Sequence, residues 1–340
     1  MRVLTRLSSV IASTALALTL SAVPATAFSS IAPSGVDVSG HQRGNGSIRW
    51  QEVAADGQKF AFVKTTEGET WVNEHYLEDV HAAHRAGLLV GTYHYARPAG
   101  DARQQAAHYA ATLATVPQHS LPPVLDIEVA EGLDPEQLQN WVRDFLHETQ
   151  RLTGRTPMVY TYRYFWREHL NDTHEFANYP LWLAAYQNHA PEPVGGWNHL
   201  TFWQRSETGR VPGIDAPVDL NLFNGTEFQL GDFVAGNHVN LGAAFQEMAT
   251  PDNGVLETLG GDNAALAGLI LAAQTGILPE GALEAAAPQL GIEPVLIDDI
   301  SRRVGELIAT GDLPVEDLQV MVDNPDYSIG DLLILLANAG

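Results

Sequence analysis

Residues 121 to 130 carry two carboxylates at the end of a short apolar run. Two prolines open the run, and its length is typical of a buried strand of about four to six residues. Asp126 and Glu128 are two positions apart, so on a strand both side chains point to one face, roughly 6 to 7 Å apart along the backbone. The alternative is an exposed strand end with two solvated acids. Because the run is apolar up to the acids, we expect them where a buried strand emerges, and such placement is costly unless chemistry needs it.

Two further acids lie in other predicted strands, Asp37 in the first and Asp219 in the last. Four carboxylates around one cavity cannot all ionise freely, so at least one pKa should be raised. Glycoside hydrolysis requires this arrangement, with a protonated acid for the leaving oxygen and a carboxylate against positive charge at the sugar. A metal cage is the competing use of four acids. Mg²⁺ sites usually accompany a phosphate-binding feature and none is visible in the sequence, so we expect no metal and no cofactor.

The elements that must position these acids alternate between short apolar runs and amphipathic stretches from residue 34 to about 230. Helices separate the early strands, whereas loops separate most of the later ones. Alternating β and α units predict a parallel sheet, and eight strands predict a closed TIM-like barrel. An open doubly wound sheet is the alternative, but no Gly-rich nucleotide loop follows any strand. The predicted strands are 35–39, 60–64, 88–95, 121–130, 158–161, 181–184, 201–203 and 218–223, and the clearest helices are 73–86, 101–116 and 134–153.

A closed barrel gathers the acids at one mouth. In such a barrel, acids at the C-terminal ends of the strands converge. The first and last strands are neighbours, so we expect Asp37 and Asp219 to lie close together. We therefore predict Glu128, Asp126, Asp37 and Asp219 as the catalytic cluster.

Aromatic residues support a sugar groove at the same mouth. All seven Trp lie between Trp50 and Trp203. Rings with a polar group suit the apolar faces of sugars, although large rings also suit any barrel core. The grouping at predicted strand ends favours the groove, and its members are Trp71, Trp182, Trp203, Tyr93, Tyr95 and Tyr160.

The N-terminus and the composition limit where the protein acts. Arg2 and Arg6 precede an apolar stretch at 10–23, and Ala-Thr-Ala at 25–27 forms a cleavage site, so residues 1–27 are predicted to be a signal peptide. No later segment approaches 18 uninterrupted apolar residues, so we expect a secreted protein without a membrane span. A formal net charge of -23 argues against nucleic acid as a partner.

Six motifs in order make residues 34 to about 230 similar to a known family. The motifs are GVDVSGHQ at 35–42, FVKTTEG at 62–68, GTYHY at 91–95, PVLDIE at 123–128, FWQ at 202–204 and VDLNLFNG at 218–225. They resemble glycoside hydrolase family 25, the secreted muramidases (N-acetylmuramidase lysozymes). The resemblance implies a modified α/β barrel of five β/α units followed by three plain strands, a (β/α)5(β)3 fold. It also implies cleavage of the β-1,4 bond between N-acetylmuramic acid and N-acetylglucosamine in peptidoglycan.

The resemblance implies roles for individual residues. Glu128 would be the general acid/base, and Asp126 would stabilise positive charge or orient the substrate's acetamido group. Asp37 and Asp219 would complete the group of acids at the base of the groove and adjust the pKa of Glu128. Groove-lining positions would be Tyr93, Tyr95, Tyr160, Trp182 and Gln204.

Other polar residues carry less specific patterns. Lys64 and Glu67 fit the second-strand motif, but a structural ion pair is an equal alternative. Histidine as a residue type could transfer protons near neutral pH, which draws attention to His41 and His94. The thirteen histidines lack metal-ligand spacing, so we expect packing or hydrogen-bonding roles.

After residue 235 the composition changes. Residues 236–340 contain no Trp, and their sixteen acidic residues face only two arginines. Apolar residues recur there at helical spacing, which predicts a small all-α domain after a barrel domain at 28–235. A cell-wall-binding module, a protein partner, self-association and a stabilising appendage remain alternatives for its role. For the whole chain the alternatives to a muramidase are a barrel hydrolase of another N-acetylated polysaccharide and a non-catalytic peptidoglycan-binding barrel.

Overall fold

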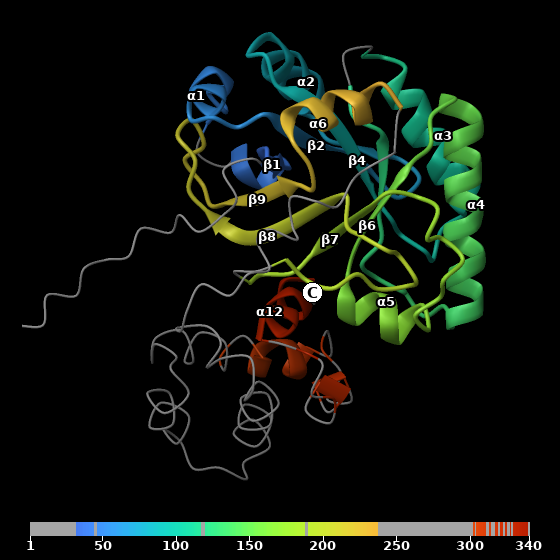
Figure 1. The fold of residues 1–340 in the computed structure, drawn as a ribbon. Helices are drawn as coiled ribbons and strands as arrows, with labels where there is room; N and C mark the ends of the chain where they lie inside the picture. The colour runs from blue at the N-terminus through green and yellow to red at the C-terminus, as the bar shows by residue number, and fades with distance from the viewer. Residues whose placement is uncertain are drawn as a thin grey trace, which may run out of the picture.

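The computed structural model describes residues 32–43, 46–116, 120–187 and 190–236, together with parts of the C-terminal region (Figure 1). The C-terminal parts are residues 302, 304–310, 313, 317–318, 320–321, 324, 327 and 329–338. The predicted signal peptide and the first half of the predicted helical domain lie outside the described residues, and the domain boundary near residue 236 stays a prediction.

Within these ranges, eight strands close into a barrel because β1 pairs with both β2 and β9. A ninth, two-residue strand, β3 (Trp71–Val72), extends β2 as a hairpin outside the ring. The closed barrel is therefore confirmed and the open sheet is excluded. The barrel strands are β1 (Ser34–Val38), β2 (Phe60–Glu67), β4 (Leu89–Tyr95), β5 (Pro123–Asp126), β6 (Met158–Tyr162), β7 (Leu181–Ala184), β8 (Phe202–Gly209) and β9 (Val218–Phe223).

Helices follow only the first five barrel strands before the chain turns to plain β7, β8 and β9. The (β/α)5(β)3 order is thus confirmed for the described residues. Strand β9 runs antiparallel to both of its neighbours, so the parallel prediction holds for the rest of the barrel but not for β9. The helices are α1 (Trp50–Ala55), α2 (Tyr76–Arg85), α3 (Ala102–Leu113), α4 (Pro135–Thr153) and α5 (Arg163–His169), and α6 (Glu227–Val234) follows β9.

Local sequence explains the boundaries of α4. The Asp134 side chain accepts from the Gln137 amide while the Gln137 side chain bonds the Asp134 amide, which forms a capping box. Pro135 occupies the first turn, where no amide hydrogen is needed. Gly154 ends the helix with φ of 69°, a left-handed conformation that favours glycine. The buried face of α4 carries Leu138, Trp141, Val142, Phe145, Leu146 and Thr149.

Helix α2 begins later than predicted. The prediction placed the start of the helix at residue 73, but the helix starts at Tyr76 with His75 at the N-cap. The Asn73 side chain donates to the Lys64 carbonyl and accepts from the His75 amide. Asn73 therefore ties β2 to the turn that follows it instead of capping the helix.

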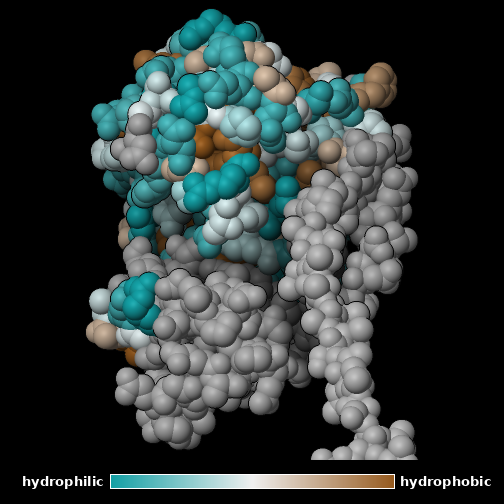
Figure 2. All heavy atoms as spheres, turned by 90° about the vertical axis from the view of Figure 1, so that its left-hand side faces the viewer, coloured by the Kyte–Doolittle hydropathy of each residue, from teal (hydrophilic) through white to brown (hydrophobic). Residues whose placement is uncertain are grey.

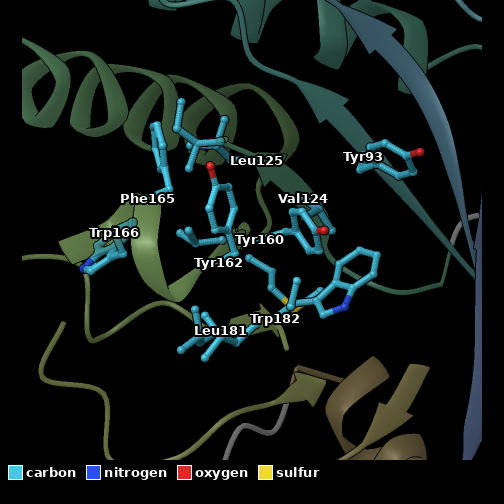
Figure 3. Packing of buried hydrophobic residues seen from close by; sticks show 14 of the residues in the cluster. Tyr93, Val124, Leu125, Tyr160, Tyr162, Phe165, Trp166, Leu181 and Trp182 are labelled. Atoms are coloured by element: carbon cyan, nitrogen blue, oxygen red, sulfur yellow. The ribbon is translucent and has the colours of Figure 1, made fainter. Parts of the chain in front are cut away.

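Aromatic rings fill the barrel interior beneath the mouth. Phe62 stacks on Trp182 with ring centroids 4.4 Å apart, and Phe202 meets Phe62 edge-on at 5.3 Å. Tyr160 lies edge-on against Trp182 at 4.7 Å, and the two side chains are neighbours in Figure 3. Such close packing makes the floor of the mouth rigid.

The face of the barrel seen in Figure 2 is mostly polar. Figure 2 turns the side with α1, β8 and β9 toward the viewer, and its described surface is mainly hydrophilic, with a few hydrophobic side chains grouped near its centre. Among the helices of the described residues, none combines the length and apolar character needed to cross a membrane.

Candidate active site

A cavity of about 280 Å³ opens at the barrel mouth. All four predicted acids and all five predicted groove residues line it. The structure therefore brings the nine predicted site residues together. The remaining lining residues are Ser39, His41, Lys64, Tyr186, Glu207 and Asn338.

Asp126 and Glu128 lie side by side where β5 ends. Asp126 is the last residue of the strand, and the chain beyond it stays extended because the Ile127 amide donates to the Tyr160 carbonyl at 3.0 Å. The Thr161 hydroxyl also donates to the Ile127 carbonyl at 2.9 Å. An extended backbone with two-residue spacing turns both acids to the same side, as predicted.

Both carboxyl groups are buried, with exposed fractions of 5% for Asp126 and 7% for Glu128. One oxygen of each, Asp126 Oδ1 and Glu128 Oε2, has no hydrogen-bond partner among the described residues. Buried polar atoms are nearly always paired, so such atoms in a cavity indicate a place for a polar ligand.

Burial is the main electrostatic influence on this pair. Burial, followed by the charges of Asp37 and Asp219, raises the pKa of Glu128, whereas the hydrogen bond with Asp126 and the charge of Lys64 oppose the rise. The net pKa of Glu128 is about 7. Burial also raises the pKa of Asp126 well above its ordinary value, helped by the adjacent negative charge of Glu128. The pair therefore retains a proton near neutral pH, the state that a general acid requires.

Asp37 and Asp219 form a second carboxyl pair on neighbouring strands. Their Cα atoms are register partners in the β1–β9 ladder, and their side chains share a hydrogen bond. Burial raises the pKa of both groups, and the charge of Asp37 raises that of Asp219 further. The predicted proximity of Asp37 and Asp219 is thus observed.

The reason that Asp219 reaches the mouth differs from the one predicted. Asp219 was expected at the C-terminal end of a parallel strand, but it is the second residue of β9. Because β9 runs antiparallel to β1, its beginning lies at the same edge of the barrel as the end of β1. The reversed strand direction thus places Asp219 at the mouth.

Two amide side chains hold Asp37 in place. Gln204 Nε2 and Asn221 Nδ2 both donate to Asp37 Oδ2, at 3.0 and 2.7 Å. These bonds favour the charged form and partly offset the effect of burial on the Asp37 pKa. In the pair with Asp219, the negative charge is therefore favoured on Asp37.

The aromatic wall of the cavity is connected to the same network. Tyr160 and Tyr186 donate their hydroxyl hydrogens to Gln204 Oε1, at 2.9 and 3.2 Å. Trp182 Nε1 donates to Asn221 Oδ1 at 2.8 Å. Both polar ends of the Gln204 amide are thus bonded within the protein, so its position serves to orient Asp37 and the tyrosines.

Lys64 brings a positive charge to the cavity. Its Nζ lies 2.7 Å from Glu67 and 4.6 Å from the ring centroid of Tyr95. Arg97 contacts Glu67 at 2.6 Å, and its guanidinium carbon lies 4.9 Å from the ring centroid of Tyr95. Both alternatives for Lys64 therefore apply, because Lys64 forms an ion pair with Glu67 and also lines the cavity.

The two histidines considered from the sequence have different surroundings. His94 is fully buried, bonds Thr66 at 2.8 Å and Gln105 at 3.0 Å, and stacks on Phe145. Burial lowers the pKa of His94 to about 3, so it stays neutral and supports the core. His41 instead lines the cavity, which its place in the first-strand motif could have suggested.

Two of the predicted groove tryptophans lie elsewhere. Trp203 is fully buried and donates its indole hydrogen to the Ala185 carbonyl at 2.7 Å. Trp71 lies on the exposed hairpin strand β3, over Lys64 at 5.3 Å. Neither lines the cavity, because strand-end position alone does not determine whether a ring faces inward.

A sequence model described as "Glycosyl hydrolases family 25" matches residues 36–214. This match spans more than half of the chain and contains Asp37, Asp126 and Glu128 in one segment. The chain belongs to glycoside hydrolase family 25. It is therefore a glycoside hydrolase by family, and the cavity at the barrel mouth is its candidate active site.

Similar proteins in this family are lysozymes and muramidases. Lysozyme M1 of Streptomyces globisporus is 35% identical over 206 residues, covering 58% of this chain and 69% of that protein. The bacterial lysozyme structure from Streptomyces coelicolor is 33% identical with a TM-score of 0.57 and covers 60% of this chain and 98% of its own. The muramidase structure from Trichobolus zukalii is 31% identical with a TM-score of 0.55 and covers 60% and 99%.

Proposed function

We propose that this family 25 protein is a secreted lysozyme that hydrolyses the β-1,4 bond between N-acetylmuramic acid and N-acetylglucosamine in peptidoglycan. The observation that carries the proposal is the buried Asp126–Glu128 pair, which retains a proton near neutral pH and leaves one oxygen of each carboxyl unpartnered among the described residues. The names of its relatives support the substrate class, and the N-terminal pattern supports export.

In this proposal Glu128 protonates the glycosidic oxygen as the bond breaks. The hydrogen bond between the two groups raises the pKa of Asp126 and lowers that of Glu128, so the pair retains a proton near neutral pH that Asp126 shares with Glu128. Asp126 stabilises the positive charge that develops at the sugar or orients the acetamido group of the substrate. The half-buried rings of Tyr95 and Tyr186 would contact the sugar rings, whereas Tyr93, Tyr160 and Trp182 line the same cavity but are buried.

The closeness of the two carboxyls favours retention of configuration at the anomeric carbon. Inverting enzymes separate their acids by about 6.5 to 9.5 Å to admit a water, whereas retaining enzymes hold them about 5 to 5.5 Å apart. Asp126 and Glu128 share a hydrogen bond, which leaves no room for that water between them. Analysis of the first-formed anomer by NMR would check this, and an inverted product would contradict it.

The deciding experiment is digestion of purified peptidoglycan by the wild type and by Glu128→Gln. We expect N-acetylmuramic acid reducing ends from the wild type, and a rate lower by about 10²- to 10⁴-fold from the variant, the usual contribution of a general acid. N-acetylglucosamine ends would make the protein a glucosaminidase instead. Binding without new ends from the wild type would refute the enzymatic proposal.

A further inference from the structure

One residue of the candidate active site comes from the far end of the chain. Asn338 lines the cavity together with Asp126 and Glu128. It is the last residue of α12 (Ile329–Asn338), which lies beyond the region matched by the family. Figure 1 shows α12 beside α5, below β7.

Specific polar contacts hold this C-terminal segment against α5. The Tyr327 hydroxyl donates to Glu168 Oε1, and the Tyr327 ring lies 5.3 Å from that of Tyr164. Arg163 Nε lies 4.0 Å from Asp331 Oδ1, and both side chains are largely buried. These partners are spread along α5, which directly follows barrel strand β6.

Apolar packing makes the contact extensive. Leu332, Ile334 and Leu335 of α12 are buried and belong to the same hydrophobic cluster as the barrel core. Helical residues Val304 and Leu307 join that cluster. A helix packed in this way holds its last turn in a defined place relative to the cavity.

The chemistry of Asn338 complements the rest of the cavity. Its carboxamide can donate two hydrogens and accept through its oxygen. Among the described residues no hydrogen bond to this side chain is formed, whereas the Gln204 amide is bonded at both ends. Asn338 is half-buried and therefore accessible to a ligand. Its groups match the hydroxyl and acetamido groups of an N-acetylated sugar.

We propose that Asn338 is a substrate-binding residue, and that the C-terminal helix completes the glycan groove of the barrel. The inference rests on the proposed action on peptidoglycan glycan. On this proposal the C-terminal segment acts within the active site. It does not act as a separate module that binds the cell wall. The family barrel alone would then lack one wall of this groove.

The test compares the full-length wild type with Asn338→Ala on soluble, uncrosslinked peptidoglycan glycan. Removing one hydrogen-bonding group from the groove should raise KM by about 3- to 10-fold, with kcat changed by less than about 2-fold. Asn338→Asp keeps the size but removes the donors, so it should raise KM at least as much. The matched control is Glu306→Gln in the same segment, which removes an exposed pair with Arg302, and neither of these two residues lines the cavity.

A binding assay separates this inference from the enzymatic proposal. Calorimetry with the same glycan compares Glu128→Gln with Glu128→Gln/Asn338→Ala, so it needs no turnover. A 3- to 10-fold weaker affinity of the double variant supports the groove role even if the wild type releases no reducing ends. Equal affinity, or equal KM for Asn338→Ala and the wild type, would overturn it. Tighter binding or faster turnover by Asn338→Ala would overturn it too, because the helix would then obstruct the groove.

Discussion

Replacing Lys64 with methionine should extend activity to higher pH. The positive charge of Lys64 lowers the pKa of Glu128 and of Asp126, against the larger effect of burial. Removing that charge raises the pKa of Glu128 above about 7. If Glu128 acts in its protonated form, kcat/KM is lost as pH rises through this pKa, so the alkaline limb must move upward.

Lys64 and Glu128 line the same cavity, which is why the charge of one affects the pKa of the other. Two unit charges on the order of 8 Å apart interact by about 2 kcal/mol at an effective dielectric constant of about 20. That energy corresponds to about 1.5 pH units. Glu67 lies 2.7 Å from Lys64 and cancels part of its field, so we expect a shift of about 0.5 to 1 pH unit.

The assay is the pH dependence of kcat/KM on soluble peptidoglycan glycan. The chain contains one other lysine, Lys59, whose Nζ pairs with Glu227 on the surface at 2.8 Å. Lys59→Met is therefore the matched control and should leave the limb in place. The fold should tolerate Lys64→Met because Glu67 keeps its contact with Arg97 at 2.6 Å. An unmoved or lowered limb, or the same shift in the control, would refute the assignment of the limb to Glu128.

Two further predictions concern stability, both measured by urea denaturation. The pKa of Glu128 is about 7 in the folded state and 4.5 ordinarily, so the free energy of unfolding of the wild type falls as pH rises from 4.5 to 7. Above pH 7 the free energy of unfolding of Glu128→Gln should therefore exceed that of the wild type by up to about 3 kcal/mol. Below pH 4.5 this group should cause no difference. A pH-independent difference would contradict this. Asp79 forms a buried ion pair with Arg43 at 2.6 Å, so Asp79→Ala should cost about 3 to 5 kcal/mol. Glu78→Ala removes an exposed partner of the same arginine and should cost less than about 1 kcal/mol; equal losses would show that burial is not the cause.

The sequence was informative wherever a local pattern determines the outcome. The capping box at Asp134 defines the start of α4 and Gly154 defines its end, and each depends on contacts with residues three or four positions away. The two-residue spacing of Asp126 and Glu128 likewise determines their common direction on any extended chain. The predicted helix at 134–153 therefore nearly matches α4, and the common direction of the two acids is observed as predicted.

The parts that could not be predicted depend on contacts between distant segments. The antiparallel direction of β9 is set by its pairing with β8 and β1, so the reason for the position of Asp219 was wrong although the position was right. Glu207 lies in a polar part of β8 where nothing local distinguishes a cavity residue from a solvated one. Asn338 reaches the cavity only through the packing of α12 on α5, which no motif encodes.

Two of the strands that no helix separates, β8 and β9, influence the charges of the acids at the barrel mouth. β8 and β9 supply the amides of Gln204 and Asn221 that hold a negative charge on Asp37. That charge raises the pKa of Glu128, which lies across the cavity after β5. A substitution that removes either amide should therefore act on catalysis through the proton of Glu128, even though neither strand carries the proposed proton donor. Strands β8 and β9 thus have a chemical role, because their amides favour the charge on Asp37 that raises the pKa of the acid.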